Sequence, residues 1–173
     1  MTVRQVLRIG HPILRRKAEP VANFGNNQLD ELITDMKDTM KVENGVGIAA
    51  PQIGVSLRVV IFGFDQNSRY PTENPIPFTV LVNPQITFLT NEVEDAWEGC
   101  LSVPKMRGLV PRHVEIKYSG YDHKGVFLER EVRGFHARVV QHECDHLDGI
   151  LYPMRINDLS YFGYSDELEI ESN

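Results

Sequence analysis

The segment His142-Glu143-Cys144-Asp145-His146 has the residue types and the spacing that hold a metal ion on a helix. Two histidines four positions apart lie one helical turn from each other, so both imidazoles can reach a single ion. Glu143 then stands where it can activate a water bound to that ion. Two core histidines beside a solvated acid would explain the same residues, so the segment by itself predicts a metal site but no particular reaction.

A catalytic site of this type needs a third protein ligand and an open coordination position. The metalloprotease pattern with a third histidine fails, because Gly149 is present but Tyr152 stands where that histidine would be. Cys100 in the sequence Glu-Gly-Cys-Leu-Ser offers a thiolate, and we prefer it as third ligand, although a lone Cys is commonly a small buried residue. Acids of the C-terminal tail are the alternative, namely Glu167, Glu169 and Glu171.

Other residues near these segments have weaker signals. Cys144 lies about 200° around the helix from His142, so we expect it to face away from the ion and to be structural. Asp145 and Asp148 are candidates to accept a hydrogen bond from a ligand imidazole, but a solvated helix face fits them better. Trp97 is expected to pack in the core.

Two helices are predicted to flank or carry the site. Between Asn27 and Asn44, apolar residues recur at three- and four-residue spacing, which indicates an N-terminal amphipathic helix. After Gly134, residues 135, 139, 142 and 146 share one face of a second helix that ends at Gly149, so both histidines point in the same direction.

Short apolar stretches between these helices predict strands at residues 58–64, 78–82 and 85–89, and a hairpin formed by residues 114–118 and 126–132. Strands dominate and are not interleaved with helices, which favours the α+β class: antiparallel strands packed around a central metal-binding helix, with the N-terminal amphipathic helix outside. We expect a single domain over residues 1–173, with a tail after about residue 158 that is extended or loop.

Composition narrows the class of protein. With 173 residues, 42% hydrophobic and 24% charged, the chain resembles a soluble globular protein. Its net charge of -6 and lack of a basic run argue against direct nucleic-acid recognition. No signal-peptide pattern opens it and no apolar run approaches the ~20 residues of a membrane span, so we expect a cytoplasmic protein with no membrane association.

Three motifs occur in order: Gly-Val-Gly-Ile-Ala-Ala-Pro-Gln at residues 45–52, Glu-Gly-Cys-Leu-Ser at 98–102 and Gln-His-Glu-Cys-Asp-His at 141–146. Together they resemble the peptide deformylases, and the likeness extends through residues 9–21 and 104–112 to about Met154. The resemblance implies a metal-dependent hydrolase that removes the formyl group from the N-terminal formyl-methionine of nascent polypeptides and releases formate. These peptides, at the ribosome exit, are the implied partners; the sequence predicts no oligomeric state.

By the same resemblance the metal ligands are Cys100, His142 and His146. They would hold one divalent ion per chain, with Fe(II) as the expected native ion and Zn, Ni or Co as replacements; the ligand types suit both Fe and Zn. Glu143 would take a proton from the attacking water and deliver it to the departing amine. The oxyanion donors would be the Gln52 side chain and the Leu101 backbone N–H.

The resemblance also implies how the substrate binds. The peptide backbone would lie extended beside Val46 and Gly47, and the methionine side chain would enter an apolar pocket near the metal helix. Arg107 is implied near the substrate, and Arg112 is implied to pair with Glu98, although a plain surface charge would explain either arginine. Separately, the stem of Arg138 is a candidate for the pocket wall.

Two other readings stay open. A metallopeptidase that cleaves internal amides would use a downstream carboxylate in place of Cys100. A module in which the ion only stabilises the fold would need a fourth protein ligand to close the site, and no further Cys or His stands at suggestive spacing.

Overall fold

The computed structural model describes residues 2–168. Within them two α-helices, α1 (Asn27–Val42) and α2 (Gly134–Leu147), accompany strands in two antiparallel sheets. The larger sheet has the order β1-β2-β3-β6-β7, with bounds Gly47–Ala49, Val59–Phe64, Ile76–Phe88, Glu115–Tyr121 and Phe127–Arg133. The smaller has the order β4-β5-β8, with bounds Val93–Cys100, Val103–His113 and Phe162–Tyr164. The described residues also form four 3-10 helices: η1 (Pro12–Arg15), η2 (Ala50–Ile53), η3 (Tyr152–Arg155) and η4 (Leu159–Tyr161).

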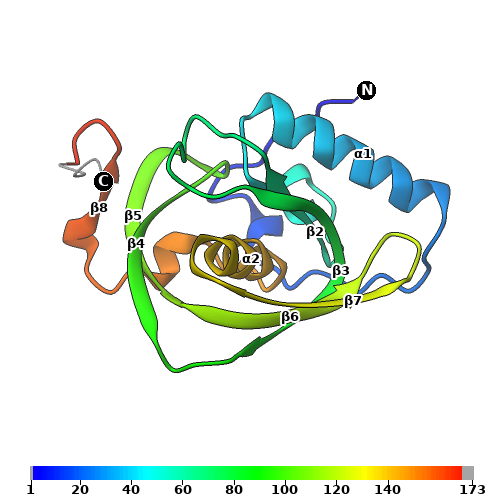
Figure 1. The fold of residues 1–173 in the computed structure, drawn as a ribbon. Coiled ribbons are helices and arrows are strands. Elements are labelled where there is room, and N and C mark those ends of the chain that lie inside the picture. Colours follow the sequence, from blue (N-terminus) through cyan, green and yellow to red (C-terminus); the bar gives the residue numbers. More distant parts are fainter. Residues whose placement is uncertain (1, 169–173) are drawn as a thin grey trace.

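Helix α2 lies at the centre, and the strands curve around it (Figure 1). All of its residues from Ala137 to Leu147 are buried. Val139, Val140 and Leu147 pack in one core cluster with residues of the large sheet such as Phe62 and Tyr118. The helix ends in a Schellman arrangement, since Ile150 N–H donates to Asp145 O at 2.9 Å and Gly149 has a φ of 73°. The predicted α+β class, with antiparallel strands around this helix, is confirmed.

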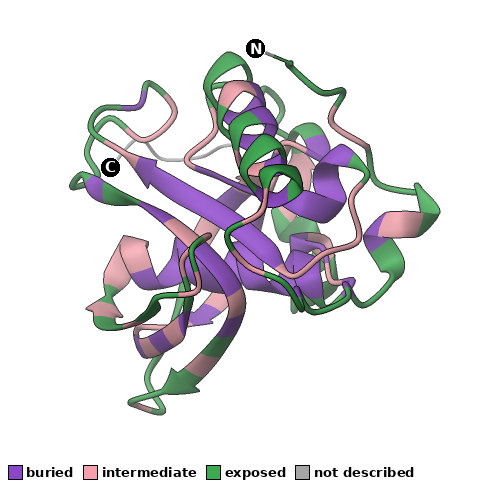
Figure 2. Cartoon of the chain, turned by 90° about the vertical axis from the view of Figure 1, so that its right-hand side faces the viewer, coloured by how far each residue is buried: buried purple, intermediate pink, exposed green. Residues whose placement is uncertain are grey.

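Helix α1 is capped by Asn26, whose side chain accepts a hydrogen bond from Leu29 N–H at 2.9 Å. Its buried residues Leu29, Leu32, Met36 and Met40 belong to a second core cluster, which also contains β1 and β2 residues. Figure 2 shows α1 with its outer side exposed and buried residues on the side toward the sheet. Helix α1 thereby covers β1 and helps to fix the position of that strand.

The two predicted strands at 78–82 and 85–89 are one bulged strand, β3, so their separation was wrong. The register with β6 shifts between Val82 and Gln85, where Asn83 adopts a φ of 52°. The Asn83 side chain bonds the backbone N–H and C=O of Val21 at 2.9 and 3.0 Å, and these bonds stabilise the irregular conformation. An Asn-Pro pair thus bends a strand here and does not end it.

The hairpin β6–β7 forms as predicted, with a turn closed by Asp122. The hairpin β4–β5 was not predicted, and neither was β8, which pairs with Met106–Gly108 of β5. The tail after about residue 158 was predicted to be extended or loop; its described part contains the short 3-10 helix η4 and the extended strand β8. Glu169 and Glu171 lie outside the described residues.

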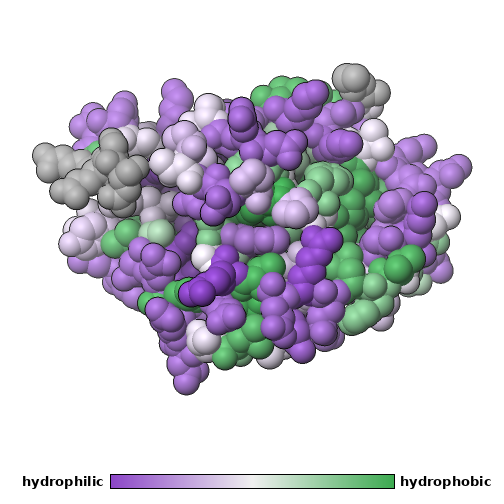
Figure 3. Space-filling model, viewed as in Figure 1, coloured by the Kyte–Doolittle hydropathy of each residue, from purple (hydrophilic) through white to green (hydrophobic). Residues whose placement is uncertain are grey.

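In the described part of the chain, neither helix has the length and apolar character needed to cross a bilayer. On the face shown in Figure 3, hydrophilic side chains predominate, and apolar surface is exposed in separate patches between them.

Candidate metal centre

Cys100, His142 and His146 form a group whose ligand atoms all lie within 4.8 Å of one another. Cys100 is the last residue of β4, and the histidines lie on successive turns of α2, so the group joins the small sheet to the central helix. Glu167, the alternative ligand inside the described residues, is not in this group. Tyr152 packs its ring against His142, with centroids 6.2 Å apart, in place of a third histidine.

The donor set fits a divalent ion. The Sγ atom of Cys100 lies 3.4 Å from Nε2 of His146. A tetrahedral ion bound at ordinary distances to one sulfur and one imidazole nitrogen separates those atoms by about 3.6 Å. Soft sulfur and imidazole nitrogens together suit iron and zinc. Three buried donors at this spacing can hold an ion with little rearrangement.

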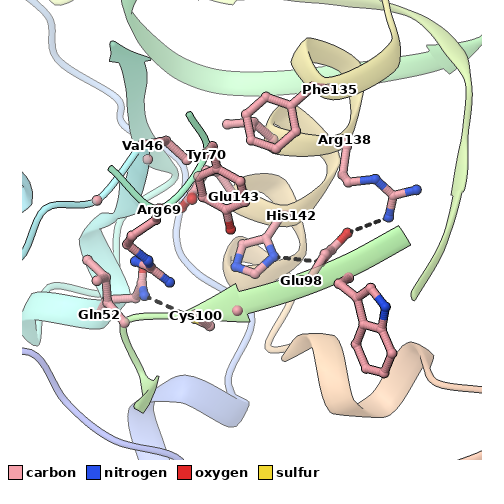
Figure 4. Close-up of a pocket in the computed structure, with 16 residues that line it drawn as sticks. Val46, Gln52, Arg69, Tyr70, Glu98, Cys100, Phe135, Arg138, His142 and Glu143 are labelled. Atoms are coloured by element: carbon pink, nitrogen blue, oxygen red, sulfur yellow. Dashed lines mark hydrogen bonds and ion pairs between the residues drawn. The ribbon is translucent and has the colours of Figure 1, made fainter. Parts of the chain in front are cut away.

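Glu98 orients the first histidine ligand. Its Oε2 accepts a hydrogen bond from Nδ1 of His142 at 2.8 Å, which leaves Nε2 of that ring as the ligand atom (Figure 4). Arg112 donates to both Glu98 oxygens at 2.9 and 3.0 Å, and Arg138 donates to Oε1 at 2.9 Å. Burial alone would raise the pKa of the Glu98 carboxyl, but hydrogen bonds from His142 and Arg112 outweigh it and hold that pKa well below its usual range.

The hydrogen bond from His142 to Glu98 was not predicted; Asp145 and Asp148 were the candidate acceptors. Asp145 instead pairs with Arg112 and Arg155 and is buried, so its expected solvated position was wrong. Asp148 pairs with Arg58 at 2.8 Å and its side chain is 45% exposed. The family resemblance implied a pair between Arg112 and Glu98, which is present, and this pair was the one signal that Glu98 lies near the metal ligands.

Glu143 is buried beside the ligands. Its Oε2 atom has no hydrogen-bond partner among the described residues, and burial raises the pKa of its carboxyl to about 7. A Cβ atom added at Gly47 would lie 2.5 Å from the other oxygen, Oε1. Glycine at position 47 therefore lets the Glu143 carboxylate lie directly against β1, and a carboxyl with this pKa can both accept and donate a proton near neutral pH.

The side-chain amide of Gln52 points toward the metal ligand Cys100. It lies in η2, where its Oε1 accepts a hydrogen bond from Ala49 N–H at 2.8 Å. Its Nε2 donates to Ser102 Oγ at 3.1 Å and lies 3.5 Å from Cys100 Sγ. The bond from Ala49 fixes which side of the amide is the oxygen, so the NH2 group faces the cysteine ligand.

A cavity opens over these groups, and Figure 4 shows the side chains that line it. Val46, Gly47 and Leu101 border it, as do Gln52 and Glu143. Its larger side chains come from a loop, from β4 and from α2: Arg69, Tyr70, Trp97, Phe135, Arg138 and Val139.

Trp97 lines this cavity, so its assignment to the core was wrong. The stem of Arg138 borders the cavity while its guanidinium bonds Glu98 and the carbonyls of Val110 and Glu94. Cys144 is in the core cluster as expected, and burial raises the pKa of its thiol.

Arg107 does not line the cavity itself but contacts Tyr70, which does; its guanidinium carbon lies 5.7 Å from the centroid of the Tyr70 ring. Arg69 lies over the same ring at 5.8 Å, and Phe135 packs against it at 4.8 Å. Arg69 and Tyr70 were not predicted, because a loop between strands has no periodicity that would indicate which side chains turn inward.

Comparison with known proteins gives a consistent result. The family model described as polypeptide deformylase matches residues 3–161. Peptide deformylase 1 of Nitrosomonas europaea is 58% identical over 166 residues, which cover 96% of this chain and 94% of that protein. A Met-Ala-Ser-bound crystal structure of the class I type b peptide deformylase from Acinetobacter baumannii has a TM-score of 0.86 and 43% identity, covering 90% of this chain and 99% of the other. The peptide deformylase of Thermotoga maritima has a TM-score of 0.80 and 35% identity, covering 91% and 100%.

Proposed function

The chain belongs to the polypeptide deformylase family, and from that premise we propose how its residues serve the reaction. It is a peptide deformylase, a hydrolase that removes the formyl group from the N-terminal methionine of nascent chains. The observation that carries the residue assignments is that the ligand atoms of Cys100, His142 and His146 lie close together, and that Cys100 and His142 line one cavity with the buried carboxylate of Glu143.

We assign Cys100, His142 and His146 as ligands of one divalent ion, with Fe(II) as the native ion and Zn, Ni or Co as replacements. When bound, the ion polarises the formyl carbonyl and lowers the pKa of a water molecule. Glu98 fixes the tautomer of His142 through the 2.8 Å hydrogen bond to Nδ1.

Glu143 moves the proton. Its Oε2 atom, which has no hydrogen-bond partner within residues 2–168, accepts a proton from the attacking water as a bond forms between the water oxygen and the formyl carbon. The same carboxyl then delivers that proton to the methionine nitrogen as the C–N bond breaks. Formate and a free N-terminus are the products, and Glu143 returns to its ionised state.

Gln52 and Leu101 stabilise the negative charge that develops on the formyl oxygen. The Gln52 amide is supported for this role because Ala49 holds its oxygen and its NH2 group faces the cysteine ligand. The Leu101 backbone N–H follows that cysteine directly, and its residue borders the cavity. Donors held in advance cost little reorganisation during the reaction.

The substrate backbone is proposed to lie along Val46 and Gly47. Strand β1 is at the edge of the large sheet, and in the described part of the chain only β2 pairs with it, which leaves its other side for an extended peptide. The methionine side chain would enter the cavity between Tyr70, Trp97 and Phe135. Arg107, behind Tyr70, would meet the residues that follow the methionine.

The wider setting is also a proposal. We place the protein in the cytoplasm, acting as a single domain over residues 1–173 on chains that emerge from the ribosome.

The test is formate release from formyl-Met-Ala-Ser by iron-loaded enzyme prepared without oxygen. Cys100→Ala is expected to lose the metal, whereas Glu143→Ala is expected to retain it and lose turnover. Failure with every divalent ion would contradict deformylation by this site, and turnover by Glu143→Ala would refute the role of Glu143.

A further inference from the structure

We propose that Arg155 and Asp145 set the donor strength of His142 from the far side of α2, acting through Arg112 and Glu98. The ion-pair network consists of Arg155, Asp145, Arg112 and Glu98. The proposal concerns two positioning residues, and it rests on the metal site of the proposed function but not on the reaction performed there.

The network is continuous. Arg155 donates from Nη2 to Asp145 Oδ1 at 2.7 Å and from Nε to Oδ2 at 3.1 Å. Asp145 Oδ2 also accepts from Arg112 Nη1 at 2.5 Å. Arg112 reaches both oxygens of Glu98, which binds Nδ1 of His142. Positive and negative groups therefore alternate along the whole path from Arg155 to the metal ligand.

Burial makes the inner members of the network sensitive to one another. The side chains of Glu98 and Arg112 are each 5% exposed, and that of Asp145 is 11% exposed. Charges removed from water interact more strongly and are screened less by salt. Arg155 differs, because its side chain is 45% exposed, so its influence should be weaker and dependent on salt.

Alternation gives the two outer residues opposite effects. Arg112 divides its positive charge between Asp145 and Glu98. If Asp145 loses its charge, Arg112 acts more fully on Glu98, which becomes a weaker acceptor from His142, and the imidazole becomes a poorer metal donor. If Arg155 loses its charge, Asp145 neutralises Arg112 more completely, and Glu98 becomes a stronger acceptor.

A matched control lies on the same helix. Asp148 pairs with Arg58 at 2.8 Å and borders the same cavity behind α2 as Asp145 and Arg155. Its ion-pair partner, Arg58, is outside the network. Asp148→Asn therefore removes one negative charge from this region while it leaves the network intact.

The experiment measures metal release from cobalt-loaded enzyme challenged with excess chelator, together with the visible absorption spectrum of the bound Co(II). Loss of a direct partner of a ligand histidine typically lowers metal affinity about 10- to 100-fold. Asp145 is one contact further away, so Asp145→Asn is expected to release metal about three- to tenfold faster. Arg155→Gln is expected to release it about twofold more slowly, and high salt should abolish this effect.

Both variants should shift the Co(II) absorption bands, in opposite directions, whereas Asp148→Asn should leave rate and spectrum near those of the parent protein. The proposal is overturned if Asp145→Asn releases metal no faster than Asp148→Asn, or if Asp145→Asn and Arg155→Gln change the rate in the same direction. Should Asp145→Asn not fold, Arg155→Gln decides alone: an unchanged or faster rate refutes the proposal. Formate release by the parent enzyme tests the proposed function separately.

Discussion

Gly47→Ala should separate the role of position 47 in placing Glu143 from any role in holding substrate. The added Cβ would lie 2.5, 2.7 and 2.8 Å from Oε1, Cδ and Cγ of Glu143. Ordinary contact begins at 3.4 Å, so the carboxylate must move by about 0.9 Å. Misplacement of a reacting group by about 1 Å can cost about 100-fold in rate. We therefore expect kcat to fall about 100-fold.

The fold should tolerate this change, because the atoms that must shift belong to the end of a side chain. Thermal unfolding and metal content should accordingly remain close to those of the parent enzyme. Gly45→Ala is the comparison, since its Cβ would meet a Leu101 methyl at 3.1 Å and both the Gly47 backbone oxygen and Met40 Cγ at 3.3 Å, contacts that smaller movements relieve. Its loss of kcat should be the smaller of the two.

The assay is formate release from formyl-Met-Ala-Ser over a range of substrate concentrations, with metal content measured on the same samples. A kcat for Gly47→Ala within about threefold of the parent value would refute the steric argument. A loss confined to KM would show that position 47 acts on the substrate backbone and not through Glu143.

Three further outcomes are expected. Gln52→Ala should lower kcat about 10²- to 10³-fold in the formate assay with metal retained, and a smaller loss would remove Gln52 from the oxyanion site. Glu98→Gln should weaken metal binding about 10- to 100-fold in a chelator competition, and unchanged metal affinity would contradict the role of Glu98. The same change should lower the free energy of unfolding by about 3 kcal/mol, because Arg112 and Arg138 lose a buried anion. Burial lowers the pKa of His136 to about 4 from 6.5, so the unfolded chain binds its proton first and stability should fall from pH 6.5 toward pH 4. Thermal unfolding of His136→Gln should show a smaller fall over that range, and an equal fall would assign the acid sensitivity to other groups.

The metal-binding helix was predictable because the two histidines are four residues apart, a spacing that acts within one element. Cys100 was preferred as third ligand on chemistry and on family resemblance, since a contact over more than forty residues leaves no periodic trace. The Glu98–His142 hydrogen bond and the pairing of Asp145 with Arg155 were missed for the same reason: each depends on how η3 and β4 pack against α2.

Strand prediction failed where local composition and tertiary pairing disagree. Strand β4 reads Val-Glu-Asp-Ala-Trp-Glu-Gly-Cys, in which adjacent acidic residues interrupt any apolar alternation, and its pairing with β5 defines it. The pair Asn83-Pro84 has the composition of a turn, yet the side-chain bonds of Asn83 to Val21 allow β3 to continue through it.

The position of the ligands on two different elements also has a consequence for local unfolding. Cys100 belongs to the small sheet, whereas α2 packs on the large sheet, so an ion bound to all three ligands would add a cross-link between two parts that otherwise meet through side-chain packing, hydrogen bonds and ion pairs. Separation of β4 from α2 would then require breakage of a sulfur–metal bond. Amide hydrogen exchange in the β4–β5 hairpin should therefore slow when the ion binds, and the small sheet should join the central helix in one cooperative unit.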